Sequence, residues 1–145
     1  MRECGVLRNY RKSSWCYKHK LKFLAKLIMK FGRVIYSADI PYTCTIGKGV
    51  VFAHNGLGVV VHDNAIIGDN CKIQQGVTIG GRNNRGFPKI ESGVEIGANA
   101  LVLGGITLGE NAVIGAGAII IKDVPPGATM VGVLAREVIR KQEQG

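Results

Sequence analysis

Aliphatic residues recur at every sixth position through most of this 145-residue chain. This spacing fits neither a helix, whose apolar positions recur every three or four residues, nor a simple alternating strand. It fits a short strand followed by a turn, repeated as stacked coils in which one aliphatic side chain per repeat points inward. The positions in this first series are Ile40, Ile46, Phe52, Val61, Ile67, Ile73, Ile79, Ile90, Ile96, Val102, Leu108, Ile114 and Ile120.

A second series, of small or β-branched residues, lies two places before the first. Coils of this kind bury their core against one another, so the pattern predicts an all-β solenoid over about residues 39–124. Because free cysteines are commonly buried, we interpret Cys44 and Cys71 as part of this core. The second series is Cys44, Ala65, Cys71, Val77, Val94, Ala100, Ile106, Ala112 and Ala118.

The period of six is broken twice. Three extra residues lie between Phe52 and Val61, around residues 54–58, and five lie between Ile79 and Ile90, within residues 80–89. Regular coils form flat faces, so a pocket is expected where insertions form loops. Both insertions lie on consecutive coils, and we expect them to be neighbours in space.

The order of the repeats also resembles a known family. The segments ADIPYTCTIGKGVVFAHNGLGVVV, IGDNCKIQQGVTIGG, PKI and IGANALVLGGITLGENAVIGAGAIIIKDVPPGATMVGVLARE resemble the hexapeptide-repeat acyltransferases, across about residues 38–138. Within them, the similarity is to the serine acetyltransferases and to relatives that acetylate sugars and polysaccharides. The resemblance implies a left-handed parallel β-helix, acetyl-CoA as donor, and a homotrimer with its active site between subunits.

We therefore expect three parts in the chain. Residues 1–37 form a basic amphipathic helical segment, residues 38–124 the left-handed β-helix acyltransferase domain, and residues 125–145 a C-terminal loop and short helix.

His54 and Asp39 are the candidate catalytic residues. In the family that the chain resembles, a histidine after the early coil deprotonates the acceptor hydroxyl, and an aspartate fifteen residues before it orients the ring; His54 and Asp39 match these places. A hydroxyl is a weak nucleophile toward a thioester unless a neutral imidazole removes its proton. A carboxylate on the other ring nitrogen fixes the tautomer and stabilises the imidazolium.

The resemblance also implies a groove for acetyl-CoA along the coil edges. Glycines allow a ligand to approach the backbone closely. The basic residues are candidates for phosphate contacts, although either could equally be a surface charge. The predicted donor-binding residues are Gly80, Gly81, Lys89, Ala98, Ala116 and Arg136.

The residues around the expected acceptor site differ from those of the serine enzymes. The serine enzymes place an acid directly before the catalytic histidine and an Arg-His pair before Pro-Lys-Ile, where this chain has Ala53 and Gly86-Phe87. We therefore favour a hydroxyl of a sugar or polysaccharide precursor over serine, with Phe87 against the sugar. Arg85 could replace the missing arginine, so serine O-acetyltransferase is the alternative. The predicted acceptor-binding residues are Asn55, His62, Arg85 and Phe87; His62 could instead be a surface residue.

Two other classes of function fit the sequence less well. Metal-dependent carbonic anhydrases built on such a solenoid need three histidine ligands, and only His54 and His62 lie in the coils, so we expect no metal site. A non-catalytic scaffold is a further alternative, but it would leave His54 and Asp39 without a role.

The net charge of +9 comes from the N-terminal segment, since residues 1–37 contain ten Lys or Arg and one acid, Glu3. Residues 18–31 are expected to form a basic helix whose apolar stripe binds an anionic membrane or packs on the solenoid or a partner subunit. Nucleic-acid binding is not favoured, because no basic face interleaved with aromatic residues follows. The stripe is Tyr17, Leu21, Leu24, Ile28 and Phe31.

The four cysteines show no CxxC spacing, and no clean apolar run marks a signal peptide or membrane span. We expect a cytoplasmic protein, at the inner face of the membrane if the basic helix binds there.

Overall fold

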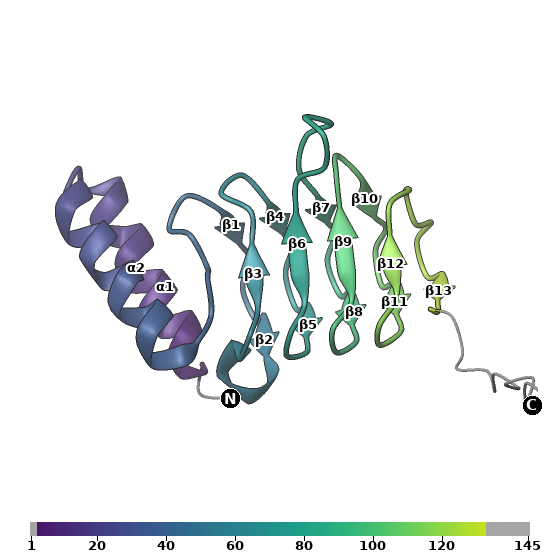
Figure 1. Cartoon of the computed structure of the whole chain (residues 1–145), viewed down its shortest axis with the longest axis horizontal. Coiled ribbons are helices and arrows are strands. Elements are labelled where there is room, and N and C mark those ends of the chain that lie inside the picture. Colours follow the sequence, from purple (N-terminus) through teal and green to yellow (C-terminus); the bar gives the residue numbers. More distant parts are fainter. Residues whose placement is uncertain (1–2, 133–145) are drawn as a thin grey trace, which may run out of the picture.

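The computed structural model describes residues 3–132 as a solenoid of short parallel strands with two helices at its N-terminal end (Figure 1). The helices are α1 (Gly5–Lys18) and α2 (Lys22–Tyr36), and a short 3-10 helix, η1 (Ala53–Gly56), interrupts the first coil. The strands are β1 (Thr45–Ile46), β2 (Val51–Phe52), β3 (Val60–Val61), β4 (Ile66–Ile67), β5 (Lys72–Ile73), β6 (Thr78–Gly80), β7 (Lys89–Ile90), β8 (Glu95–Ile96), β9 (Leu101–Leu103), β10 (Thr107–Leu108), β11 (Val113–Ile114), β12 (Ile119–Ile120) and β13 (Thr129–Met130).

From β1 to β9 each strand pairs in parallel with the strand three places later in the chain, so three strands make one coil; β11 pairs instead with β13. The result is three sheets: sheet A (β3-β6-β9-β12), sheet B (β1-β4-β7-β10) and sheet C (β2-β5-β8-β11-β13). We call the turns that join sheet C to sheet A the C–A corner, and those that join sheet A to sheet B the A–B corner. Strand β13 extends sheet C past residue 124, where the period of six ends.

The core follows both series of the repeat. In sheet B, Ile46, Ile67, Ile90 and Leu108 are in register with one another, and every member of the two series is buried. The predicted left-handed parallel β-helix is therefore confirmed. Cys44 and Cys71 lie in this core as predicted, and burial raises the pKa of both thiols.

The helix predicted over residues 18–31 is present as α2, but it begins four residues later than predicted, and a separate helix, α1, precedes it. The chain turns at residues 19–21, where Lys20 has a φ of 64°, and α2 begins at Lys22. No glycine or proline marks this break in the sequence. As a result Tyr17 belongs to α1, and Ala25 and Gly32, rather than the predicted stripe, form the buried side of α2. Leu21, Leu24 and Phe31 are exposed.

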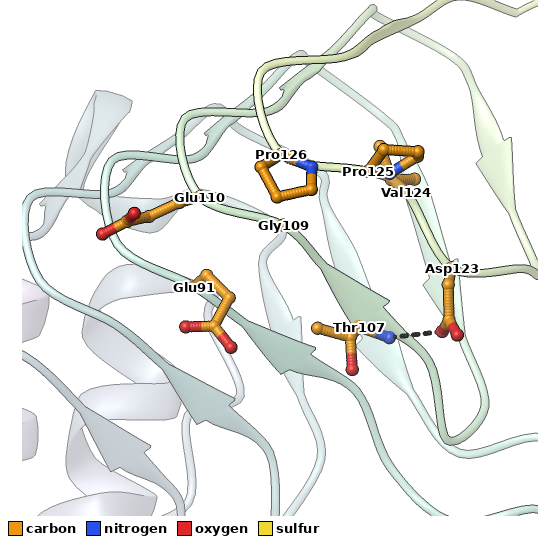
Figure 2. A pocket seen from close by; sticks show the side chains of 8 residues that line it. All are labelled: Glu91, Thr107, Gly109, Glu110, Asp123, Val124, Pro125 and Pro126. Atoms are coloured by element: carbon orange, nitrogen blue, oxygen red, sulfur yellow. Dashed lines mark hydrogen bonds between the residues drawn. The ribbon is translucent and has the colours of Figure 1, made fainter.

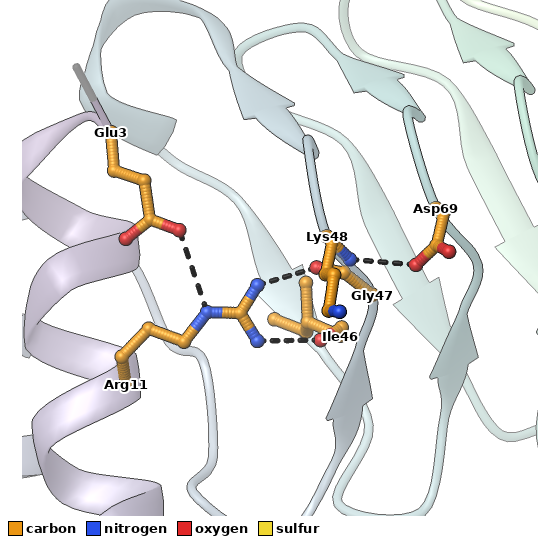
Figure 3. A network of polar contacts seen from close by, with 6 residues as sticks. All are labelled: Glu3, Arg11, Ile46, Gly47, Lys48 and Asp69. Carbon is orange, nitrogen blue, oxygen red and sulfur yellow. Dashed lines mark hydrogen bonds and ion pairs between the residues drawn. The ribbon is translucent and has the colours of Figure 1, made fainter. Parts of the chain in front are cut away.

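Helix α1 covers the open edge of the first coil. Its Val6, Leu7 and Tyr10 are buried in the same core as the strands. The Arg11 guanidinium, itself paired with Glu3, donates to the carbonyl oxygens of Ile46 and Gly47 (Figure 3). An uncovered first coil would expose unpaired strand carbonyls, so α1 takes the place of a preceding coil. The predicted short C-terminal helix lies outside the described residues.

Candidate functional site

The first break in the period forms η1 at the C–A corner of the first coil. Two consecutive residues there, His54 (φ 51°) and Asn55 (φ 56°), adopt the left-handed conformation. Asparagine and histidine tolerate this region better than most residues, because their short polar side chains form local hydrogen bonds. Both side chains are exposed, and the predicted base is therefore accessible to a substrate.

Asn55 has a structural partner that the sequence did not indicate. Its Oδ1 accepts a 2.9 Å hydrogen bond from the backbone N–H of Gly5, in the first turn of α1. The first N–H groups of a helix have no partner within the helix, so Asn55 satisfies one of them. Next to it, the buried Gly56 lies so close to Val6 that an added Cβ would be 3.1 Å from the valine Cγ1. The loop that carries His54 is thus anchored to α1.

Asp39 lies one layer before the first strand of sheet A. Its backbone N–H donates to the Val59 carbonyl (2.8 Å), and its carbonyl accepts from the Val61 N–H (2.9 Å). The carboxylate Oδ2 is 3.4 Å from Nη1 of Arg33, at the end of α2. Within residues 3–132 no hydrogen bond joins Asp39 to His54, so the orienting role of this carboxylate stays a prediction.

The second break forms a loop, residues 81–88, at the A–B corner between the second and third coils; it projects from the top of the solenoid in Figure 1. The rings of His62 and Phe87 stack, with centroids 5.9 Å apart. An added Cβ at Gly81 would be 3.3 Å from the His62 ring. The loop is held to the next coil by a hydrogen bond from the Gly105 N–H to the Arg85 carbonyl. His62, Gly81 and Phe87 line part of a cavity of about 380 Å³.

The expectation that the two insertions are neighbours was wrong for a single chain. The first follows a strand of sheet C, whereas the second follows a strand of sheet A, so they lie at opposite edges of sheet A. His54 is therefore at one edge, and the predicted acceptor-binding residues His62, Arg85 and Phe87 are at the other.

The predicted donor-binding residues are divided in the same way. Gly80 and Gly81 lie at the A–B corner, while Ala98 and Ala116 occupy equivalent turns of the C–A corner. Lys89 begins β7 in sheet B, where its Nζ forms a 2.8 Å ion pair with Glu91. Arg136 lies outside the described residues. One chain alone therefore does not assemble the predicted donor groove.

Sequence reasoning missed a basic cavity at the A–B corner. Arg82, Arg85 and Lys122 line a space of about 350 Å³ together with one acid, Asp123, and with Gly104 and Gly105. Arg82 also lines the cavity beside His62, so the two cavities adjoin at this residue, and together we call them the A–B corner groove. The period of six could have predicted this cavity. Lys122 follows the inward Ile120 at the corner where the long loop follows the inward Ile79.

A second cavity, of about 440 Å³, lies on sheet B and is acidic (Figure 2). Glu91, Glu110 and Asp123 line it beside Pro125 and Pro126. The Asp123 carboxylate accepts a 2.8 Å hydrogen bond from the Thr107 N–H. The equivalent N–H groups of earlier coils, such as that of Lys89, donate instead to a backbone carbonyl of the next coil. At the end of sheet B, the Asp123 side chain thus takes the place of such a carbonyl. The negative charge of the cavity disfavours a phosphate-bearing ligand.

Residues 3–132 contain neither a candidate metal cluster nor a helix that could span a bilayer. No three His, Cys, Asp or Glu side chains there are arranged to hold a metal ion. None of the helices in that part is long and apolar enough to span a bilayer.

Comparisons with known proteins point to one family. A family model described as "Bacterial transferase hexapeptide (six repeats)" matches residues 87–122. The chain is 37% identical over 134 residues to the serine acetyltransferase of Synechococcus elongatus, across 90% of this chain and 54% of the relative. It is 41% identical over 127 residues to that of Bacillus pumilus, across 86% of this chain and 58% of the relative. The chain thus spans about half the length of the curated relatives it matches.

Solved structures agree. The serine acetyltransferase of Neisseria gonorrhoeae in complex with serine matches with a TM-score of 0.83 at 38% identity, covering 91% of this chain and 55% of that one. The serine acetyltransferase of Brucella abortus in complex with coenzyme A matches with a TM-score of 0.83 at 36% identity, covering 90% and 53%.

Proposed function

We propose that this chain, which is similar over about 90% of its length to serine acetyltransferases and carries the hexapeptide repeat, is an acetyl-CoA-dependent O-acetyltransferase whose acceptor is serine. The observation that carries this proposal is the similarity of 90% of the chain to a serine acetyltransferase, including the coil that bears His54. Complexes of two related enzymes, one with serine and one with coenzyme A, supply the acceptor and the donor of the proposed reaction.

His54 is the proposed general base. Its imidazole accepts the proton of the acceptor hydroxyl as the oxygen attacks the thioester carbonyl carbon. The C–S bond of the tetrahedral intermediate then breaks, and the coenzyme A sulfur takes the proton back from the imidazolium. Asp39 is the proposed positioning residue for the ring, from the layer below β3.

We further propose a homotrimer in which sheet A is buried. The outward positions of this sheet include Val60, Leu101 and Ile119, and Ile119 is 63% exposed in the single chain. Sheet C also exposes Val51 and Val113, but the strands between them carry an outward ion pair of 2.6 Å, formed by Lys72 and Glu95. An exposed apolar face of this kind marks an interaction surface.

This arrangement accounts for the separated site residues. When sheet A of each subunit faces its neighbours, the C–A corner of one subunit meets the A–B corner of the next. His54 of one subunit is then completed by the loop carrying Arg85 and Phe87 from another. The same contact brings Ala98 and Ala116 to the glycines at residues 80–81.

The donor is proposed to lie along the A–B corner groove. Arg82 and Lys122 supply cations for the phosphates of coenzyme A, since arginine pairs with phosphate through two parallel hydrogen bonds. Lys89 is a weaker candidate, because Glu91 already neutralises it. The cytoplasm is the proposed location, where the four free cysteines would stay reduced.

A sugar hydroxyl is the second candidate acceptor. Our expectation from the sequence favoured it, but the similar proteins are serine acetyltransferases, so we propose serine first. The observation that keeps the sugar in view is Phe87, partly exposed and stacked on His62, a platform suited to the apolar face of a sugar. Ala53 beside His54 also leaves serine without the acid expected for its ammonium group.

A thiol-release assay tests both proposals. The full chain and acetyl-CoA are combined with serine, with simple sugars and with nucleotide sugars, and His54→Asn protein serves as the blank. Release dependent on serine supports the first proposal, and release dependent on a sugar alone overturns it in favour of the second. No release above the blank with any acceptor would support a non-catalytic scaffold.

A further inference from the structure

Helix α2 presents an apolar face to solvent. Four apolar residues, at spacings of four, four and three, form one side of the helix, and all four are exposed. They are Phe23, Leu27, Phe31 and Val34. Phe23 is 82% and Val34 80% exposed, more than any other large apolar side chain in residues 3–132. We call these four residues the α2 outer face.

The α2 outer face is turned away from the rest of the chain because α2 packs on α1 through its opposite side. At Gly32 the two helices approach so closely that an added Cβ would overlap the Asn9 side chain. Ala25, on the same side, is fully buried, and the Ser13 hydroxyl donates to its carbonyl oxygen. The solenoid therefore does not cover the α2 outer face.

A groove between α1 and α2 extends the α2 outer face. It has a volume of about 770 Å³ and an apolar floor that includes Leu27, Phe31 and Val34. Lys12 of α1 and Lys30 of α2 lie along it. Apolar side chains between lysines are typical of helices that lie in the interface of a membrane, with the apolar groups at the acyl boundary and the cations at the headgroups.

The charges around this face are uncompensated. Among residues 3–132, the ion pairs of the two helices involve Arg11 and Arg33, and none involves a lysine of either helix. Glu3 is the one acid in residues 1–37, and it already pairs with Arg11. The lysines of this segment are Lys12, Lys18, Lys20, Lys22, Lys26 and Lys30.

We propose that the α2 outer face and its lysines bind an anionic lipid surface, so that the protein is held at a membrane by its helical end. Charge decides between the possible occupants. A second copy docked face to face would oppose two identical basic surfaces, whereas anionic headgroups complement them and attract each lysine. The proposal does not depend on the acetyltransferase reaction.

The test is sedimentation of the full chain with vesicles of phosphatidylcholine, alone or mixed with phosphatidylserine. We expect binding to the mixed vesicles that is at least about tenfold stronger than to phosphatidylcholine alone and that weakens as salt is added. The double variants Lys26→Glu/Lys30→Glu and Leu27→Ser/Phe31→Ser should each weaken it by about tenfold or more. Two single-residue controls on the solenoid, Lys48→Glu for charge and Val131→Ser for an exposed apolar side chain, should bind like the unaltered chain.

The outcomes separate the occupants. Equal sedimentation with both vesicle types, or no loss in the two double variants, overturns the proposal. A third result would also overturn it. If the unaltered chain does not bind vesicles and Leu27→Ser/Phe31→Ser lowers the molar mass measured by light scattering, the α2 outer face is a subunit contact. Far-ultraviolet circular dichroism confirms that each variant is folded. His54→Asn protein must bind vesicles normally, which keeps this result independent of the proposed reaction.

Discussion

The Tyr10 hydroxyl donates a hydrogen bond of 2.7 Å to the carbonyl oxygen of Cys44. On the next coil the equivalent oxygen, that of Ala65, accepts instead from the backbone N–H of Thr45 (2.9 Å). A side chain of α1 thus supplies the donor that a preceding coil would supply, and the first coil of the solenoid has no free edge at this point. Helix α1 is therefore part of the solenoid's structure.

Tyr10→Phe should lower the free energy of unfolding by about 1–3 kcal/mol, because it leaves the buried Cys44 carbonyl without a donor. Urea denaturation followed by circular dichroism measures the change. Tyr17→Phe is the control, since Tyr17 is exposed at the end of α1 and should change little. If Tyr10→Phe and Tyr17→Phe have equal urea midpoints, the Tyr10 hydroxyl does not stabilise the first coil.

Burial of Cys44 predicts a pH dependence of stability. Burial raises the pKa of its thiol from 9.0 to about 12. The folded state therefore holds this proton more tightly than the unfolded state does, so the contribution to stability is complete below pH 9.0 and is lost as the pH rises toward 12. Urea midpoints across this range should fall less steeply for Cys44→Ala, a residue that other coils carry at the same inward position. If the urea midpoints of the two proteins fall equally with pH, the buried Cys44 thiol is not the cause of the pH dependence.

Much of the fold could be predicted from the sequence because each coil repeats one local rule. An inward aliphatic residue and a small residue two places before it stay buried whichever coil they belong to, which is why both series, from Ile40 to Ile120, were located correctly. Counting three strands per coil could also have placed the two insertions at different corners. The first insertion follows the second strand of its coil, and the second insertion follows the third strand of its coil.

The rest depends on contacts between distant residues. Asn55 and Gly5 are fifty positions apart, and neither residue by itself indicates a helix anchor. Arg33 reaches Asp39 only because α2 ends beside the first coil. The turn at Lys20 carries no glycine or proline, so the apolar periodicity was read across it as one helix.

Replacement of His54 tests the proposed base. His54→Ala should lower kcat by at least about a hundredfold, because no other group would accept the hydroxyl proton. His54→Asn is the better variant for structure, since asparagine tolerates the φ of 51° at this position. Retention of more than about a tenth of the activity by both folded variants would rule out His54 as the base.

Asp39→Asn should lower kcat less than the His54 variants do, because it removes the charge and the orienting acceptor but leaves the imidazole. Arg33→Gln is its matched control. It removes the ion pair to the same carboxylate, is exposed, and should change stability by less than about 1 kcal/mol. If Arg33→Gln lowers kcat as much as Asp39→Asn does, the aspartate acts through α2 rather than through the histidine.

Three substitutions at Asn55 separate its hydrogen bond from its backbone conformation. Asn55→Asp keeps an acceptor for the Gly5 N–H and tolerates the φ of 56°, so we expect nearly unaltered stability. Asn55→Gly loses the acceptor but keeps the conformation, and should cost about 0.5–1.5 kcal/mol. Asn55→Ala loses the acceptor and strains the backbone, and should cost about 1–2 kcal/mol more than glycine. Because the loop carries His54, kcat should fall in the same order, aspartate above glycine above alanine. A kcat that is equal in all three, despite different urea midpoints, would mean that the anchor to α1 supports the fold but does not position the base.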